Sequence, residues 1–211
     1  WKETTIANTS ERQFTQEFEC EFLGSVDTLI SAAKLRTLVY DDPLVQNAGL
    51  DVYENPIDNH DYIICVDVSR GLAQDYSAFV IIDITHAPWK LVAKYRNKDI
   101  RPMLFPNVIY NVATNYNNAH VLIEVNDIGE AVAASLYYDV EYENVLMCAM
   151  RGRSGQVVGQ GFSGNKVQMG VKMSKTVKAQ GCSNLKTLIE DDKLLARDYN
   201  IVAELTTFIQ N

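Results

Sequence analysis

Three β-rich runs in the middle of the chain constrain the fold most strongly. They cover residues 62–68, 77–85 and 89–96, and the connections between them are short. Short connections join antiparallel neighbours, because a parallel pair needs a crossover of a dozen or more residues. The first three strands of the sheet are therefore predicted to be antiparallel.

After these runs the pattern changes to alternating helices and strands. We expect helix, strand, helix and strand in turn over residues 105–118, 119–125, 127–139 and 144–150, then helices over 174–190 and 200–210 around a short extended link at 193–195. Such alternation favours parallel pairing through right-handed crossovers. The whole order is that of an α/β ribonuclease H-like fold, a mixed sheet with flanking helices.

The size and composition of the chain indicate one globular domain. Its 211 residues are 47% hydrophobic and 22% charged, which is ordinary for a soluble protein with a single core. Proline and asparagine turn signals up to Asn59 separate an N-terminal arm from the periodic part. We expect an arm or linker over residues 1–58 and a ribonuclease H-like domain over residues 59–211, with its compact core beginning near His60.

Neither a membrane segment nor an oxidising compartment is indicated. No apolar run approaches the ~18 residues that a membrane span needs, and the N-terminus lacks the apolar segment of a signal peptide. The four cysteines form no C-x-x-C pair, and three lie in apolar or helical contexts typical of buried free thiols. We expect a reducing compartment and no membrane partner.

Two of the predicted strands end on an acidic residue. Asp67 ends the apolar run of residues 62–67, and Glu124 ends the run of residues 120–124. Because the first and fourth strands are neighbours in this fold, both carboxylates are expected at one edge of the sheet. An acid that ends an apolar run needs a partner or a cation. Mg²⁺ is the natural candidate, with Mn²⁺ as its substitute, because proteins hold Mg²⁺ with one or two carboxylates and a substrate phosphate.

A nuclease is the enzyme that such a site would serve. Paired metal ions roughly 3.5–4 Å apart activate water and stabilise the leaving oxygen in phosphodiester hydrolysis. Asp67 and Glu124 would then be the catalytic metal ligands. Asp75, in the polar turn before the second strand, is a weaker third candidate, since an aspartate there is often only a turn residue.

Each acid also has a structural interpretation. Asp67 could bond the amides of its own turn, and Glu124 could form a salt bridge with Arg70. Taken singly, each structural role is more frequent than catalysis. Taken together and in this topology, the two acids favour a metal site.

Basic residues that could contact DNA gather late in the chain. The formal net charge of −8 argues against nonspecific attraction of nucleic acid by overall charge, so a local patch must supply it. The densest basic region contains Arg151, Arg153, Lys166, Lys172, Lys175 and Lys178. The last three recur every three residues and would share one side of a helix. Contacts would be with the DNA backbone and carry little sequence preference, although a solvated charged face is the more frequent meaning of such a run.

Several of these segments resemble one known family. They are Phe18–Gly24, Asp67–Gly71 with Asp75 and Tyr76, Glu124 followed by Gly129, and Gly181–Lys186 with Leu188–Glu190. Over nearly its whole length the sequence resembles the C-terminal nuclease domain of the large terminase subunit of tailed bacteriophages with long contractile tails.

The resemblance implies a specific biological role. It implies a magnesium-dependent endonuclease that cuts concatemeric viral DNA to start and end headful packaging in the host cytoplasm. Double-stranded DNA would be the substrate, and the viral portal and the small terminase subunit would be partners of the full-length protein. The motor ATPase of the family lies upstream, and Trp1 to about Glu21 resemble its tail and linker.

One departure from the family pattern concerns the third catalytic acid. The family has it in an Asp-Asp motif after the last matching segment, whereas this sequence stops at Asn211. Asp191, Asp192 and Asp198 lie too early to match that motif. We therefore expect the domain to be truncated at its C-terminal end, and residues 1–211 to cleave DNA more slowly than a longer chain that includes the motif.

Three other functions are compatible with parts of the sequence. The turn at Asp67–Gly71 resembles the phosphate-binding turn of actin-like ATPases, but those proteins need a second lobe that 211 residues do not provide. A noncatalytic module that docks a packaging motor would bind its partner without metal. Resolvases and transposases of the same fold are a nearer alternative, and branched-junction substrates would separate them from a terminase.

Overall fold

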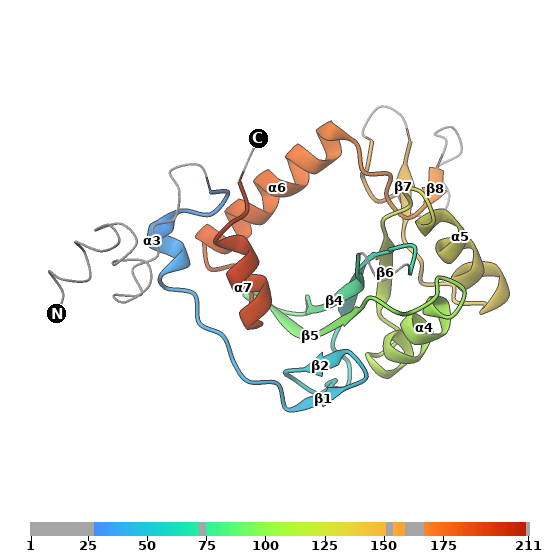
Figure 1. Cartoon of the computed structure of the whole chain (residues 1–211), viewed down its shortest axis with the longest axis horizontal. Coiled ribbons are helices and arrows are strands. Elements are labelled where there is room, and N and C mark those ends of the chain that lie inside the picture. The colour runs from blue at the N-terminus through green and yellow to red at the C-terminus, as the bar shows by residue number, and fades with distance from the viewer. Residues whose placement is uncertain (1–27, 72–74, 151–153, 159–166, 210–211) are drawn as a thin grey trace, which may run out of the picture.

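The computed structural model of the chain describes residues 28–71, 75–150, 154–158 and 167–209 (Figure 1). Its main sheet has the strand order β1-β2-β5-β4-β3-β6, with β9 paired to β5. These strands are β1 Val45–Asn47, β2 Leu50–Val52, β3 Tyr62–Asp67, β4 Ser77–Asp83, β5 Trp89–Asn97, β6 His120–Ile123 and β9 Leu194–Leu195. The sheet is mixed, as predicted.

The strands that were predicted from apolar runs pair as expected. β3, β4 and β5 are antiparallel neighbours, and β6 runs parallel to β3 with Val66 opposite Ile123. Along β3, Tyr62, Ile64 and Val66 are buried. Burial of every second residue follows from the pleat, because successive side chains point to opposite faces.

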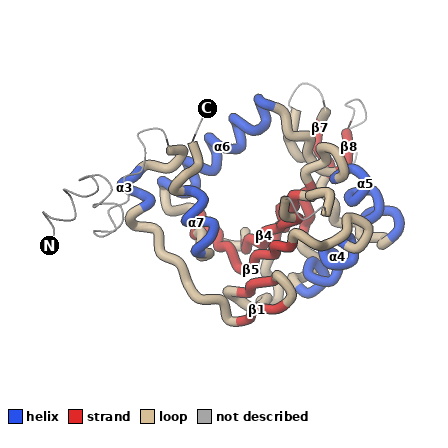
Figure 2. The backbone as a smooth tube through the Cα atoms, viewed as in Figure 1, coloured by secondary structure: helices blue, strands red, loops and turns tan. Residues whose placement is uncertain are grey.

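Helices cover both faces of the sheet (Figure 2). They are α3 Ala32–Leu35, α4 Phe105–Asn115, α5 Gly129–Ala134 continuing as the π-helix η1 Ser135–Asp139, α6 Lys175–Glu190 and α7 Tyr199–Leu205. The larger core joins α4, α5 and η1 to the face that contains Ile81. The smaller core joins α3, α7 and the C-terminal end of α6 to the opposite face, where Ile82 lies.

The predicted strand over residues 144–150 is only partly correct. Val145 makes a single parallel bridge to Val121, and the chain then leaves the main sheet as β7 (Met147–Ala149), which pairs with β8 (Val167–Met169). Val171 bridges Glu124 instead. The far edge of β6 is therefore shared by two segments that are distant in the sequence, which no local pattern could indicate.

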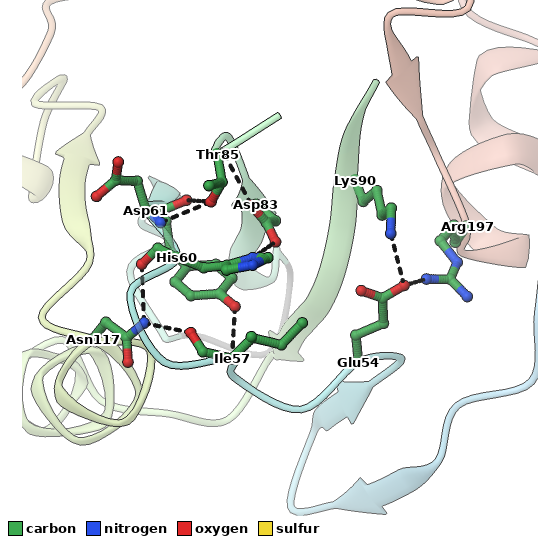
Figure 3. Close-up of polar contacts among 10 residues, drawn as sticks. Glu54, Ile57, His60, Asp61, Asp83, Thr85, Lys90, Asn117 and Arg197 are labelled. Atoms are coloured by element: carbon green, nitrogen blue, oxygen red, sulfur yellow. Dashed lines mark hydrogen bonds and ion pairs between the residues drawn. The ribbon is translucent and has the colours of Figure 1, made fainter. Parts of the chain in front are cut away.

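Packing begins well before His60, contrary to expectation. The β1–β2 hairpin pairs with β5, and Leu29, Ile30 and Leu35 are buried in the smaller core. Side chains also fix the segment that follows the hairpin (Figure 3): the Asn117 amide donates to the carbonyls of Ile57 (2.7 Å) and His60 (2.9 Å). The N-terminal boundary of the packed structure is thus set by tertiary contacts. An ATPase domain upstream stays a prediction.

Asp83, the last residue of β4, is buried. Its carboxylate accepts from the Thr85 amide at 2.9 Å and pairs with His60 Nδ1 at 2.7 Å (Figure 3). Burial alone would raise the pKa of Asp83, but the hydrogen bonds from Thr85 and His60 outweigh it and lower the pKa. This acid stabilises the fold at the edge opposite to that of Asp67.

Within the described residues, none of the helices combines the length and the apolar character that crossing a membrane requires.

Candidate metal and DNA site

Asp67 and Glu124 lie side by side at the end of two neighbouring parallel strands. Val66 is opposite Ile123 in the register, and the Glu124 amide donates to the Val66 carbonyl at 2.9 Å. The next residue on each strand is the acid. Asp67 is exposed and Glu124 is partly buried, so both carboxylates can be reached from the same edge of the sheet. The expected juxtaposition of these acids is present.

The two acids are electrostatically unfavourable neighbours. Burial raises the pKa of Glu124, the negative charge of Asp67 raises it further, and Lys178 opposes both effects. In the described part of the chain, neither carboxylate has an ion pair or a side-chain hydrogen bond. A divalent cation would relieve this repulsion, and carboxylate oxygens are the ligands that Mg²⁺ prefers. The residues present therefore fit a magnesium ion.

The two structural interpretations of these acids do not match the contacts. Arg70 donates to Asp127 at 2.6 Å, and both of these side chains are exposed. The amides of the turn after Asp67 are bonded by serine hydroxyls: Ser69 N–H donates to Ser77 Oγ at 3.1 Å, and Gly71 N–H donates to Ser69 Oγ at 3.3 Å. Neither Arg70 nor the turn amides compete for the two carboxylates.

Two glycines hold the end of β6 in place. A Cβ on Gly129 would lie 1.9 Å from the Glu124 carbonyl oxygen, and a Cβ on Gly170 would lie 2.2 Å from the Ile123 carbonyl oxygen. Gly170 also has a φ of +72°, which side chains other than glycine rarely adopt. Larger residues would displace the backbone that carries Glu124. Gly129, one of the residues that carry the family resemblance, is thus explained sterically: a side chain there would collide with the Glu124 carbonyl.

Among the described residues, Asp75 does not form a metal-binding group with Asp67 and Glu124. It lies in an exposed turn two residues before β4. Over the described ranges, no group of three or more His, Cys, Asp or Glu side chains is placed to hold a metal ion. The structure therefore brings together two of the three predicted acids.

The predicted lysines lie around the start of α6, but Lys172 precedes the helix, so the three do not share one side of a helix as expected. Lys172 precedes α6, Lys175 begins it, and Lys178 lies close enough to lower the pKa of Glu124. All three are exposed. Arg151, Arg153 and Lys166 of the same predicted patch lie outside the described residues.

Asn126 positions this helix, a role that no motif in the sequence indicates. Its side-chain oxygen accepts from the Met173 amide at 2.8 Å, and its side-chain nitrogen donates to the Met173 carbonyl at 3.0 Å. Met173 immediately precedes the N-cap residue of α6, Ser174. This pair of bonds ties the start of the lysine-bearing helix to the loop two residues after Glu124. Only a three-dimensional structure places residues 126 and 173 together.

A polar groove runs along the same helix. It has a volume of about 730 Å³ and is lined by Ser154, Gly155, Gln156, Thr176, Val177, Gln180, Gly181 and Asn184. No charged residue is among these, and the hydroxyl and amide groups can donate to phosphate or sugar oxygens. None of the three predicted lysines lines the groove, and the helical repeat places its residues on a different face of α6 from Lys175 and Lys178.

The three acids near the end of the chain have structural partners. Asp198 is buried and caps α7, Asp191 pairs with Lys193 at 2.8 Å, and Asp192 pairs with Lys34. Each carboxylate is already bound to a cation of the chain. Their exclusion as metal ligands agrees with these contacts.

Comparison with known protein families shows which family this chain belongs to. The model of the terminase RNaseH-like domain family matches residues 64–211. The chain belongs to this family. The resemblance to large terminase nuclease domains and the ribonuclease H-like fold are thereby confirmed.

Solved terminase structures share the fold. The large terminase nuclease of thermophilic phage G20c with bound magnesium is 21% identical, over 88% of this chain and 82% of that one, with a TM-score of 0.65. The same values hold for the cobalt-bound form. The large terminase nuclease domain of Thermus phage P74-26 is 22% identical, over 85% of this chain and 77% of that one, with a TM-score of 0.61. The TM-scores show that these proteins share one architecture with this chain.

Removing the charge of Glu124 is expected to stabilise the metal-free terminase domain. A carboxyl group whose pKa is raised on folding favours the fold below its unfolded-state pKa, and this contribution is lost as the pH rises through the folded-state pKa. Glu124→Gln should therefore raise the free energy of unfolding at pH 7 by about 0.5 kcal/mol, a small value because solvent screens part of the repulsion. Urea denaturation in the presence of chelator measures it.

Glu130→Gln is the matched control, because Glu130 is an exposed acid in the first turn of α5. It should leave the stability unchanged or lower it slightly, since acids favour helix N-termini. The Glu124→Gln gain should also vanish below the ordinary glutamate pKa of about 4.3. A loss of stability at pH 7 would mean that Glu124 has a stabilising cationic partner instead.

Proposed function

We propose that this chain is a divalent-metal-dependent DNA endonuclease domain that cuts concatemeric viral DNA at the start and end of headful packaging. The observation that supports this most directly is the adjacency of Asp67 and Glu124 on neighbouring parallel strands, where neither carboxylate has an ion pair among the described residues. Mg²⁺ is the proposed ion, with Mn²⁺ as a substitute. The magnesium-, cobalt- and zinc-bound forms of the G20c nuclease support a divalent ion.

The residues have distinct roles in this proposal. A bound divalent cation would supply positive charge to the scissile phosphodiester and lower the pKa of an attacking water. Asp67 and Glu124 would hold the ion, and Asp75 would contribute only when substrate is bound. Lys172, Lys175 and Lys178 would neutralise backbone phosphates beside the acids, together with Arg151, Arg153 and Lys166.

The wider context follows the family. Double-stranded DNA is the proposed substrate in the host cytoplasm, and residues 1–58 would connect the domain to an upstream ATPase. The portal and the small terminase subunit are proposed partners of the full-length protein. An acid outside this sequence would complete the metal site.

Incubation with supercoiled plasmid tests the proposal directly. The protein should convert plasmid to nicked and linear forms in Mg²⁺ or Mn²⁺, and added chelator should stop the conversion. The absence of any metal-dependent conversion, in a protein that remains folded by circular dichroism, would contradict a nuclease function. DNA binding without cleavage and without metal would favour the docking-module alternative.

Neutralising the lysines beside the acids should weaken DNA binding without changing its sequence preference. For the triple variant Lys172→Gln, Lys175→Gln, Lys178→Gln, the slope of log affinity against log salt should flatten by about 2.7, because each phosphate contact contributes about 0.9. Fluorescence anisotropy over a salt series measures the slope.

Lys186→Gln provides the control, since Lys186 is exposed on α6 but lies eight residues beyond Lys178. That separation is more than two helical turns. Its effect should be smaller than that of Lys178→Gln alone. Equal slopes for wild type and the triple variant would mean that these lysines do not contact DNA phosphates and only form a solvated charged face.

A further inference from the structure

The carboxylate edge of the sheet has a second basic surface, on the side away from α6. The antiparallel register places Asp67 opposite Ala78, and Ser77 opposite Asn97, so β5 ends at the same edge as the two acids. Strands lie about 4.8 Å apart, so the end of β5 is about 14 Å from the end of β6. The chain that leaves β5 there, residues 98–104, connects it to α4 (Figure 1). We refer to these residues as the β5–α4 loop.

This loop packs against Gly71, in the turn that follows Asp67. A Cβ on Gly71 would lie 2.6 Å from the Ile100 carbonyl oxygen and 3.5 Å from the Arg101 Cα. Gly71 is four residues after Asp67 and has a φ of +67°. The Asn97 side chain accepts from the amides of Asp99 (2.8 Å) and Ile100 (3.0 Å), which holds the start of the loop. The position of the loop relative to the acids is therefore defined.

The loop carries two basic side chains, Lys98 and Arg101, and one exposed acid, Asp99, so its net charge is positive. Lys98 and Arg101 are exposed, and neither forms an ion pair among the described residues. Arg96, at the end of β5, lies over the half-exposed Tyr76 ring at 3.9 Å and has only a long contact of 3.7 Å with Glu204. At the other end of the same sheet, Lys193 is paired with Asp191 at 2.8 Å, and Lys90 has a long contact of 3.6 Å with Glu54. Among the described residues, Lys98 and Arg101 thus carry positive charge without an ion pair at the sheet edge that holds the two carboxylates.

Two apolar side chains project from the end of this loop. Met103 is 85% exposed and Leu104 is 57% exposed, while the next residue, Phe105, is fully buried in the core. Exposed apolar side chains that gather in one place mark an interaction site, and some DNA-binding proteins place Leu or Met side chains against bases. They would lose their contact with water if DNA covered the loop.

We propose that the β5–α4 loop binds the second strand of duplex DNA, across the groove from the strand that is held at Asp67 and Glu124. The separation of about 14 Å is similar to the roughly 12 Å width of the major groove of B-DNA. Lys98 and Arg101 contact the phosphates of this strand, and Met103 and Leu104 rest against its sugars and base edges. This inference rests on the proposed function in that DNA is taken to be the substrate, and it adds how a duplex is recognised.

The test compares duplex with single-stranded DNA of the same sequence. The double variant Lys98→Gln, Arg101→Gln should lose about tenfold or more in duplex affinity at 0.1 M salt, and its salt slope should flatten by about 1.8. Its affinity for the single strand should stay within about twofold of wild type, because only the second strand contacts the loop. Fluorescence anisotropy with end-labelled DNA, in chelator so that nothing is cut, measures both.

The matched control is Lys90→Gln, Lys193→Gln, which makes the same charge change at the opposite edge of the sheet. It should leave duplex affinity within about twofold, because exposed charges beyond a Debye length of about 10 Å are screened. A second variant, Met103→Ser, Leu104→Ser, should weaken duplex binding with an unchanged salt slope. Thermal unfolding of each variant confirms that it is folded.

The outcomes separate this inference from the proposed function. If wild-type protein cuts plasmid but the loop variant binds duplex normally, the second-strand contact is wrong and the nuclease proposal stands. An equal loss for the variant and its control, or for duplex and single strand, also overturns the contact. If the variant loses only duplex affinity while wild type fails to cut, the contact stands and the nuclease proposal fails.

Discussion

Asp67→Asn should abolish metal-dependent plasmid cleavage while the protein remains folded. The substitution keeps the size of the side chain but removes the charge that binds a cation. Metal ligation in such sites contributes several kcal/mol of transition-state stabilisation. A loss of about 4 kcal/mol corresponds to about a thousandfold lower rate, since each 1.36 kcal/mol is a factor of ten. Quantified conversion of supercoiled to nicked plasmid measures the rate.

The folded state should tolerate this change. Asp67 is exposed and has no side-chain partner among the described residues, so its replacement leaves no buried group unsatisfied. It also removes the charge that raises the pKa of Glu124. The melting temperature in chelator should therefore equal or exceed that of wild type, and Mg²⁺ should no longer raise it.

Asp127→Asn is the control for charge at this edge. Asp127 is an exposed aspartate three residues after Glu124, paired with Arg70 instead of facing the metal site. Its substitution should reduce cleavage only slightly. Asp75→Asn should lie between the two if Asp75 acts only with bound substrate. Cleavage at the wild-type rate by Asp67→Asn would show that Asp67 is not a metal ligand.

The part of the fold that could be predicted is the part that strong local patterns specify. β3, β4 and β6 are apolar runs or alternating runs with clear ends, and their short or long connections determine antiparallel or parallel pairing. Once β3 and β6 are neighbours, the juxtaposition of Asp67 and Glu124 follows from the register. The adjacency of these two acids could therefore be predicted from the sequence.

The remaining elements depend on contacts that the sequence does not display. β1 and β2 are three residues each and are held by pairing with β5, so no periodic pattern marks them. The pairing of Asp83 with His60 joins residues 23 positions apart, so no local pattern indicates it. The basic residues of the β5–α4 loop were overlooked because they are spread over a strand end and a turn, and only the packing of Gly71 brings them to the acids.

Asp198→Ala should be strongly destabilising, because Asp198 joins α7 to the sheet. Its carboxylate is buried, caps α7 through the Ile201 amide at 2.8 Å, and accepts hydrogen bonds from Tyr53 and Lys94. Burial alone would raise the pKa of Asp198, but these hydrogen bonds outweigh it and lower the pKa. Removing the carboxylate leaves the Lys94 ammonium buried in mid-sheet, with Asp51 at 3.3 Å as its remaining partner.

Breaking a buried ion pair by removing one partner costs about 3–5 kcal/mol, which is about 6–20 °C in melting temperature for a domain of this size. Asp191→Ala, which removes an exposed acid paired with Lys193, should cost less than about 1 kcal/mol.

The stabilisation by Asp198 should depend on pH. A carboxyl group with a lowered folded-state pKa stabilises the fold above its unfolded-state pKa, and this stabilisation is lost as the pH falls through the folded-state pKa. Wild type and Asp198→Ala should therefore differ most near pH 7 and converge in acid. Equal melting temperatures at pH 7 would mean that Lys94 and the start of α7 are held by other contacts.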